Sequence, residues 1–189
     1  MKSKFVEIFG DKNEDVHWLT VRDIKSIVTK GTTPTTLGYN FDVDGTINFV
    51  KVENISNDGD IFGPFDKISE ECNSAMLRSE LKADDILVSI AGTVGKTAIV
   101  NEEILPANTN QALAIIRLDK SKGILPEYLY YYLKQESAFS QFDDMKKIAN
   151  RANLSLDNIE NVKIPNYRKE LQIEFIDYAK FCDKLKFEV

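Results

Sequence analysis

The stretch LKADDILVSIAGTVGKTAIVNEEILPANTNQALAIIR, which runs from Leu81 to Arg117, decides the fold. Its apolar runs have the length of buried β-strands, and they are Ile86–Ile90, Thr97–Val100 and Ala112–Leu118. Glycine-containing turns and the segment ANTNQ (Ala107–Gln111) separate these runs. The stretch therefore predicts a β-rich centre in which short strands are joined by tight turns.

The segment GTVGKT (Gly92–Thr97) looks like part of a phosphate-binding loop. Such a loop needs a glycine, four further residues and then Gly-Lys-Ser/Thr, with a strand before it and a helix after it. The first glycine would stand at position 90, where the chain has Ile90, and the residues after the turn are typical of a strand. No helix N-terminus is then expected to receive a phosphate. We interpret the segment as a reversal between two strands, with Lys96 at or near its tip.

The composition is that of a globular chain, with 43% hydrophobic and 29% charged residues. No apolar run approaches the roughly 20 residues that span a bilayer. The start, MKSKFVEIFGDKNED, lacks the hydrophobic stretch of a signal peptide, so a cytoplasmic location and no membrane partner are expected. A net charge of −6 argues against a uniformly basic nucleic-acid binder and leaves room only for a local basic patch.

The residues that enzymes use for catalysis form no recognisable group in this sequence. His17 is the single histidine, which excludes a site built on two imidazoles. Cys72 and Cys182 match no metal-binding spacing and are interpreted as reduced, structural cysteines. Adjacent carboxylates such as Asp84 and Asp85 would point to opposite faces of a strand. We therefore predict no catalytic residue, no metal and no cofactor, and the chain is not expected to be an enzyme.

Further elements complete an α+β domain around the centre. Ile47–Val52 is typical of a strand, and Ser69 is placed to cap a helical segment, Ser69–Leu81. A helix is expected over Ile124–Met145, with Pro126 in its first turn. The three tyrosines at 130–132 could stack on bases, but helical spacing turns them to different sides, and packing in the core is favoured.

The C-terminal segment contains no Gly or Pro after position 165, and a helix is predicted over Arg168–Val189. Apolar side chains repeat there at alternating spacings of four and three, which is the rhythm of a coiled-coil seam. The seam residues are Leu171, Phe175, Tyr178, Cys182, Leu185 and Val189. Two interpretations stay open: a helix that folds back on its own domain, and a helix that docks on a partner.

Two regions offer side chains suited to nucleic acid. The loop Lys30–Thr36 is rich in hydroxyl groups and is stiffened by Pro34, so it is either a plain connection or a contact to phosphates or base edges. Lys146, Lys147 and Arg151, with asparagines beside them, form the densest positive patch of the chain. Asn and Gln side chains pair with adenine, and Arg and Lys pair with guanine.

Five segments, in the same order along the chain, resemble parts of the specificity subunits of type I restriction-modification systems, and in particular one target recognition domain. In chain order they are FVEIFGD, Gly31-Thr32-Thr33-Pro34, INFVKVENIS, DDILVSIAGTVGKTAIV with ANTNQALAII, and LSLDNIENVKIP. The resemblance implies a β-rich recognition domain, with a mixed twisted sheet and flanking helices, over residues 16–165. It assigns residues 1–15 to the end of a conserved helix and a linker, and residues 166–189 to a partial spacer and dimerisation helix with coiled-coil character.

The resemblance implies a non-enzymatic reader of double-stranded DNA that recognises one half of a split target. The helices would recruit modification subunits that use S-adenosylmethionine to methylate adenine, a restriction subunit would join them, and terminal helices would pair two copies. Whether the chain is a natural half-subunit that dimerises or a fragment of a two-domain subunit stays open. The residues expected to face DNA are Thr32, Thr33, Thr35, Lys51, Asn54, Lys96, Asn108, Asn110, Lys146, Lys147 and Arg151.

Two rival functions remain at this stage. A protein-interaction module would assemble a multi-subunit complex without touching DNA, and the acidic net charge favours it slightly. A nucleotide hydrolase rests on GTVGKT alone, and ATP hydrolysis lost in Lys96→Ala would be needed to support it.

Overall fold

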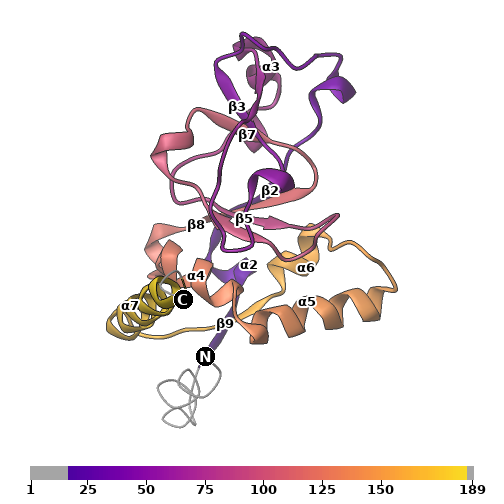
Figure 1. Cartoon of the computed structure of the whole chain (residues 1–189). Coiled ribbons are helices and arrows are strands. Elements are labelled where there is room, and N and C mark those ends of the chain that lie inside the picture. The colour runs from indigo at the N-terminus through magenta and orange to yellow at the C-terminus, as the bar shows by residue number, and fades with distance from the viewer. Residues whose placement is uncertain (1–16, 187–189) are drawn as a thin grey trace.

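The structure is a computed structural model that describes residues 17–186. The helix end expected within residues 1–15 and the seam residue Val189 lie outside the described residues. Within the described part the expected α+β class is confirmed, with strands through the centre and most of the helices gathered at one end (Figure 1).

The described strands form three sheets. β1 (Trp18–Thr20) pairs antiparallel with β9 (Lys163–Pro165), so the strand that enters the domain lies beside the strand that leaves it. The central antiparallel sheet has the order β2 (Lys25–Lys30), β8 (Leu113–Leu118), β5 (Ile86–Ser89) and β6 (Thr97–Ile99). The third sheet has the order β4 (Asp66–Ile68), β3 (Ile47–Val50) and β7 (Ala107–Thr109), and β3 and β7 run parallel.

The helices are mostly short. The α-helices are α2 (Val21–Ile24), α3 (Glu70–Ala75), α4 (Pro126–Leu133), α5 (Glu136–Ala149), α6 (Leu156–Glu160) and α7 (Lys169–Lys186). Single 3₁₀ turns are η2 (Pro34–Leu37), η3 (Val52–Asn54), η4 (Leu77–Ser79), η5 (Glu102–Ile104) and η6 (Lys120–Lys122). The predicted cap is confirmed, because the Ser69 hydroxyl accepts a hydrogen bond from the Cys72 amide at 3.2 Å.

The central sheet divides the molecule into two lobes. β3, β7 and α3 lie in the upper lobe of Figure 1, whereas α4, α5, α6 and α7 lie below the sheet. The largest hydrophobic core lies between the sheet and the lower helices, and the core at the far end of the upper lobe is small. The lower lobe is therefore expected to contribute most to stability, because buried apolar area is its main source.

The expected core packing of the tyrosines is confirmed for Tyr130 and Tyr132, which are buried, while Tyr131 is half-buried. Their hydroxyls are satisfied as buried hydroxyls must be. Tyr132 donates to the Lys163 carbonyl at 3.0 Å, and Tyr128, one turn earlier, donates to the Pro165 carbonyl at 2.8 Å. Both side chains thus fasten β9 to α4.

Helix α7 folds back on its own domain, which favours one of the two interpretations left open. Phe175 and Ile176 are buried, and the Phe175 ring meets the Tyr128 ring edge-on with 5.5 Å between centroids. Phe175 and the half-buried Leu171 therefore belong to the domain core rather than to an open seam. Phe181 remains 59% exposed, so a second apolar face is left on the outside.

Candidate nucleic-acid interface

Four connections meet at one end of the central sheet, which we call the loop edge. It consists of residues 31–36 after β2, residues 110–112 before β8, the turn 91–96 between β5 and β6, and residues 150–154 before α6. Backbone hydrogen bonds join them, because the Ile90 amide donates to the Ala112 carbonyl at 2.8 Å and the Leu154 amide donates to the Ile90 carbonyl at 2.9 Å. Antiparallel pairing places the first three at the same end, and the bond of Leu154 to Ile90 adds the fourth.

The early threonine loop is clamped to the segment before β8. The Gly31 amide donates to the Asn110 carbonyl at 3.2 Å, and a Cβ on Gly31 would lie only 1.7 Å from the Thr109 carbonyl oxygen. The Thr33 hydroxyl donates to the Gln111 side-chain oxygen at 2.9 Å. Two segments whose bonded residues are 78 positions apart in sequence thus form one surface, and Thr35 is exposed next in the chain.

The GTVGKT turn is a hydrogen-bonded reversal, as interpreted from its sequence. Gly92 and Gly95 have φ of +73° and +93°, which favour glycine, and the Ser89 hydroxyl donates to the Thr93 carbonyl. Lys96, which was expected at or near the tip, is the last residue of the turn. Its backbone is bonded across the hairpin to Ser89, and its ammonium donates to the Ile55 carbonyl at 2.7 Å, so this lysine ties the hairpin to the loop after η3.

Two of the expected DNA-facing amides are instead structural. Asn108 is fully buried, and its side-chain nitrogen donates to Asn73 at 2.8 Å and to the Met76 carbonyl at 3.2 Å. Asn54 is 7% exposed and donates to the carbonyls of Phe62 and Pro64. Neither amide can reach a base edge in this conformation, because each fixes a backbone turn inside the upper lobe.

The next two expected residues lie at the surface with partners of their own. The Lys51 ammonium pairs with Asp66 and lies 4.9 Å from the centre of the Phe41 ring, so it is held within the upper lobe. Asn110 lies on the loop edge and is half-buried, and its side-chain oxygen accepts from the Ala112 amide at 2.9 Å. Asn110 therefore shapes the loop that presents Gln111.

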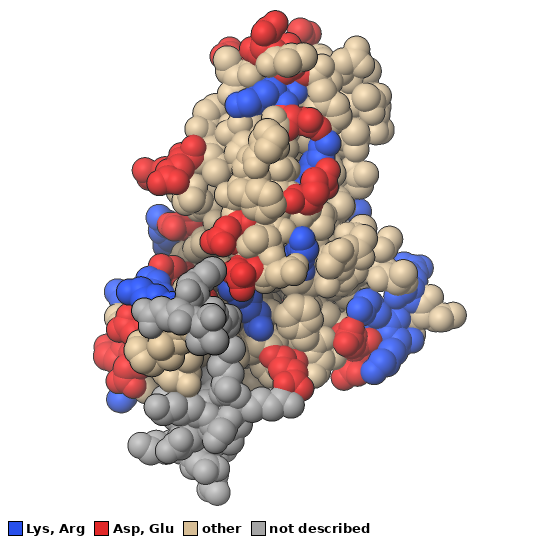
Figure 2. All heavy atoms as spheres, viewed as in Figure 1, with Lys and Arg blue, Asp and Glu red and all other residues tan. Residues whose placement is uncertain are grey.

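The basic residues lie at the C-terminal end of α5, where Figure 2 shows blue side chains with red ones beside them. Asn150 ends the helix in the left-handed conformation at φ 47°, which sends residues 151–154 back to the sheet. Lys146 pairs with Asp143 at 2.6 Å, and this ion pair lowers the pKa of the Asp143 carboxyl. The aspartates partly offset the patch, and Arg151 and Lys147 are its most exposed cations.

Gln111 is the residue that the sequence interpretation missed. It is exposed on the loop edge and is held by Thr33. Its place inside ANTNQ was visible in the sequence, but strand alternation could not show which amide of that segment turns outward. The hydrogen bonds of Asn108, Thr109 and Asn110 hold those side chains against the protein, and Gln111 is the amide that turns outward.

A cavity of about 510 Å³ lies at the opposite end of β8 from the loop edge. Its lining includes Lys82, Arg117, Lys120 and Lys169 around an apolar floor. Arg117 is occupied by a two-pronged ion pair with the buried Asp85, and this hydrogen bonding raises the pKa of the guanidinium. Within residues 17–186 there is no group of three or more potential metal-ligating side chains, and no helix long and apolar enough to cross a bilayer.

Comparison with known proteins places this arrangement in a family. A family model described as the type I restriction modification DNA specificity domain matches residues 13–172. The specificity subunit of the type I restriction enzyme EcoBI from Escherichia coli is 31% identical over 137 residues, which cover 71% of this chain and 28% of that protein. The chain thus spans under a third of this curated relative.

Solved structures share the fold. A chain of a type I restriction-modification system, from a study of its complex assembly and conformational transition, superposes with a TM-score of 0.70 at 18% identity, covering 97% of this chain and 43% of that one. The HsdS subunit from Thermoanaerobacter tengcongensis gives a TM-score of 0.63 at 18% identity, covering 97% and 42%. With 160 of its residues matched by the family model, the chain belongs to the type I restriction modification DNA specificity domain family.

Proposed function

We propose that the chain reads one half of a split double-stranded DNA target as part of a type I restriction-modification specificity subunit. The observation that carries this proposal is the loop edge, where Thr33 is bonded to the exposed Gln111 and where the connection that follows the basic end of α5 joins the sheet through Leu154. Phosphate contacts from lysine and arginine position such a protein, while amide and hydroxyl side chains read base edges.

We propose that residues 16–165 form the recognition domain and that residues 166–189 contribute a partial spacer or dimerisation helix. The chain would perform no covalent chemistry of its own. It would direct modification subunits, which bind S-adenosylmethionine and methylate adenine, and also a restriction subunit, in the cytoplasm where the DNA lies.

Methylome mapping tests the function directly. Cells that express the chain with its modification subunits should carry methylated adenine at one recurring motif, and cells that lack only this chain should lose that motif. A palindromic split motif would indicate two copies acting together, and an asymmetric motif would indicate one recognition domain in a larger subunit. An unchanged methylation pattern after deletion would refute the proposal.

Gel-shift measurements separate this function from a protein-interaction module. The chain with its modification subunits should shift random duplex DNA at low salt, and the shift should disappear as the salt concentration rises. If the chain assembles with the modification subunits but the complex does not shift DNA, the interaction module is favoured instead.

A further inference from the structure

We propose that Gln111 is a specificity-determining residue and that it reads an adenine through its side-chain amide, with Thr33 as the residue that positions it. This inference rests on the proposed function, since it assigns one base contact within a DNA-reading surface. Gln111 is the exposed amide of the segment before β8, and the side-chain oxygens of Asn110 and Asn108 each accept from a backbone amide.

The backbone that carries Gln111 is fixed on both sides. Before it, the Thr109 hydroxyl donates to the Val50 carbonyl at 2.7 Å and the Asn110 carbonyl accepts from Gly31. After it, the Ala112 amide donates to the Asn110 side chain and the Ala112 carbonyl accepts from Ile90. An exposed residue between such bonded neighbours has little freedom to move its Cα before or after binding.

The side chain is fixed as well. Thr33 precedes the buried Pro34, which holds Thr33 in an extended conformation with φ −72° and ψ 134°. Its hydroxyl donates to Gln111 Oε1 at 2.9 Å. A free glutamine loses considerable rotamer entropy when it is immobilised, and a side chain already held in place avoids most of that loss on binding.

The hydrogen bond to Thr33 leaves a defined set of donors and acceptors on Gln111. Its Nε2 group makes no hydrogen bond to any described residue, so both N–H donors of this exposed side chain are available to a ligand. Oε1 keeps a second lone pair, because a carbonyl oxygen accepts two hydrogen bonds. One donor and one acceptor side by side match N7 and the N6 amino group of adenine in the major groove.

The test is a selection from a random duplex library, carried out with the chain assembled with its modification subunits. In the wild type one position of the selected motif should be adenine. Gln111→Ala should lower the discrimination between adenine and other bases at that position about tenfold or more, because a two-pronged pair is lost. Gln111→Glu should shift the preference at the same position towards cytosine, because a carboxylate accepts from the cytosine amino group.

Variants of the positioning residue separate orientation from contact. Thr33→Val removes the hydroxyl while keeping the shape, and it should reduce the same discrimination several-fold. Thr33→Ser keeps the hydroxyl and should restore it. Asn161→Ala changes an exposed amide just after α6, outside the loop edge, and should leave the motif as it is in the wild type. Thermal unfolding of each variant checks that the fold is retained.

The possible failures are distinguishable. A wild-type complex that selects no motif at all overturns the proposed function. A wild-type complex that selects a motif, which Gln111→Ala and Gln111→Glu then leave unchanged at every position, overturns the role of Gln111 alone. Equal motifs for Thr33→Val and the wild type overturn the positioning role.

Discussion

Amide side chains of one type do two different jobs in this molecule, and burial decides which. Asn108 lies at the centre of the upper lobe, where it joins β7 to α3 and to the Met76 carbonyl. Removing a buried amide lowers the free energy of unfolding more than removing an exposed one does, because the buried groups that it leaves without a partner cannot bond to water. Burial, rather than residue type, therefore separates structural from reading amides.

Asn108→Ala should lower the free energy of unfolding by about 1–3 kcal/mol, because it leaves the Asn73 oxygen and the Met76 carbonyl without their donor. The selected DNA motif should stay as in the wild type. Urea unfolding measures the first effect and library selection the second. A changed motif with unchanged stability would indicate that Asn108 contacts DNA.

At the scale of single elements, the end of α5 is the clearest candidate for contact with the DNA backbone. Its cations project beyond the sheet, and Figure 2 shows them on the outer end of the lower lobe. Exposed ion pairs such as Lys147 with Asp144 at 3.7 Å are weak and exchange readily for a phosphate. The aspartates limit the local charge without preventing that exchange.

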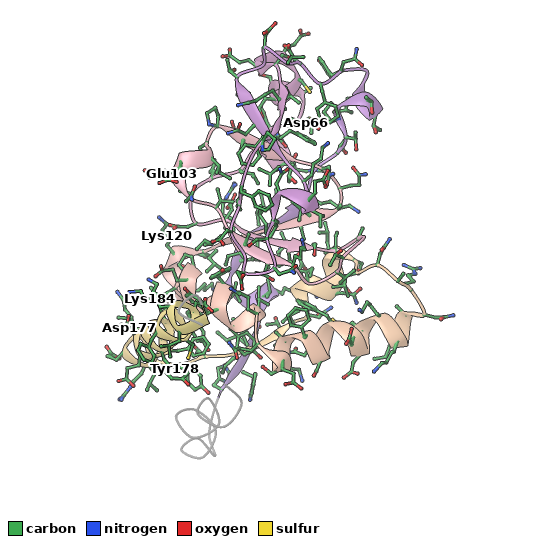
Figure 3. All side chains as sticks on the ribbon, in the orientation of Figure 1. Asp66, Glu103, Lys120, Asp177, Tyr178 and Lys184 are labelled. Carbon is green, nitrogen blue, oxygen red and sulfur yellow. The ribbon has the colours of Figure 1, made fainter. Side chains whose placement is uncertain are left out.

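Replacing both Lys147 and Arg151 by alanine should weaken binding to all DNA sequences and reduce the salt dependence. The slope of log K against log salt should become shallower by up to about 2, since each phosphate contact contributes roughly 0.9. Fluorescence anisotropy at several salt concentrations measures it. Lys120→Ala is the matched control, because Figure 3 shows Lys120 on the opposite side of the molecule from the end of α5. An unchanged slope in the double variant would remove this patch from the interface.

Helix α7 offers a second prediction at this scale. Phe175→Ala should destabilise the domain by about 3–5 kcal/mol, because Phe175 is buried against Tyr128. Phe181→Ser should change stability by less than about 0.5 kcal/mol but weaken pairing with a second copy or a modification subunit. Chemical unfolding and co-purification measure the two effects. Normal co-purification and normal oligomer size in Phe181→Ser would exclude this face as a docking surface.

The elements were more predictable than the contacts between them. The strands at the centre were evident because apolar runs and glycine turns act over a few residues, and Pro126 does begin α4. The single helix expected over 124–145 is instead two, since the chain turns at Lys134 and Gln135 between α4 and α5. No Gly or Pro stands at that break to mark it in the sequence.

The site was less predictable for the same physical reason. The threonine loop and the ANTNQ segment could each be proposed from composition, but their joining through Gly31 and Thr33 depends on the pairing of β2 with β8. Lys96 was expected at or near a turn tip, facing DNA, and only the distant Ile55 carbonyl explains why its ammonium is bonded within the protein instead. Long-range partners decide which way a polar side chain faces.

At the scale of the whole molecule, the buried tyrosines of α4 link stability to alkaline pH. Burial raises the pKa of Tyr128 and Tyr132, and it raises the pKa of Tyr131 to about 12, whereas an unfolded tyrosine ionises near 10. Below about pH 10 the tyrosines are neutral in both states. As pH rises from about 10 towards 12, only the unfolded chain ionises fully, so this stability is lost.

The free energy of unfolding should therefore fall steeply above about pH 10. Tyr128→Phe should be less stable than the wild type at neutral pH by about 1 kcal/mol, since it loses the bond to Pro165, but its alkaline decline should be shallower. Urea unfolding between pH 8 and 11 measures both. Parallel curves for the two proteins would contradict the assignment.

The pairing of β1 with β9 also bears on how this unit fits into a longer polypeptide. Trp18 lies opposite Pro165, so the two flanking segments meet the domain only about one strand spacing apart, roughly 5 Å. A host chain interrupted at this point would need almost no rearrangement to accept the insert. The loop edge lies on a different sheet from β1 and β9. Residues that contact DNA can therefore change without altering the geometry at which the domain joins the rest of the polypeptide. Moving this domain from one polypeptide to another, and its target preference with it, thus requires only that the pairing of β1 with β9 is kept.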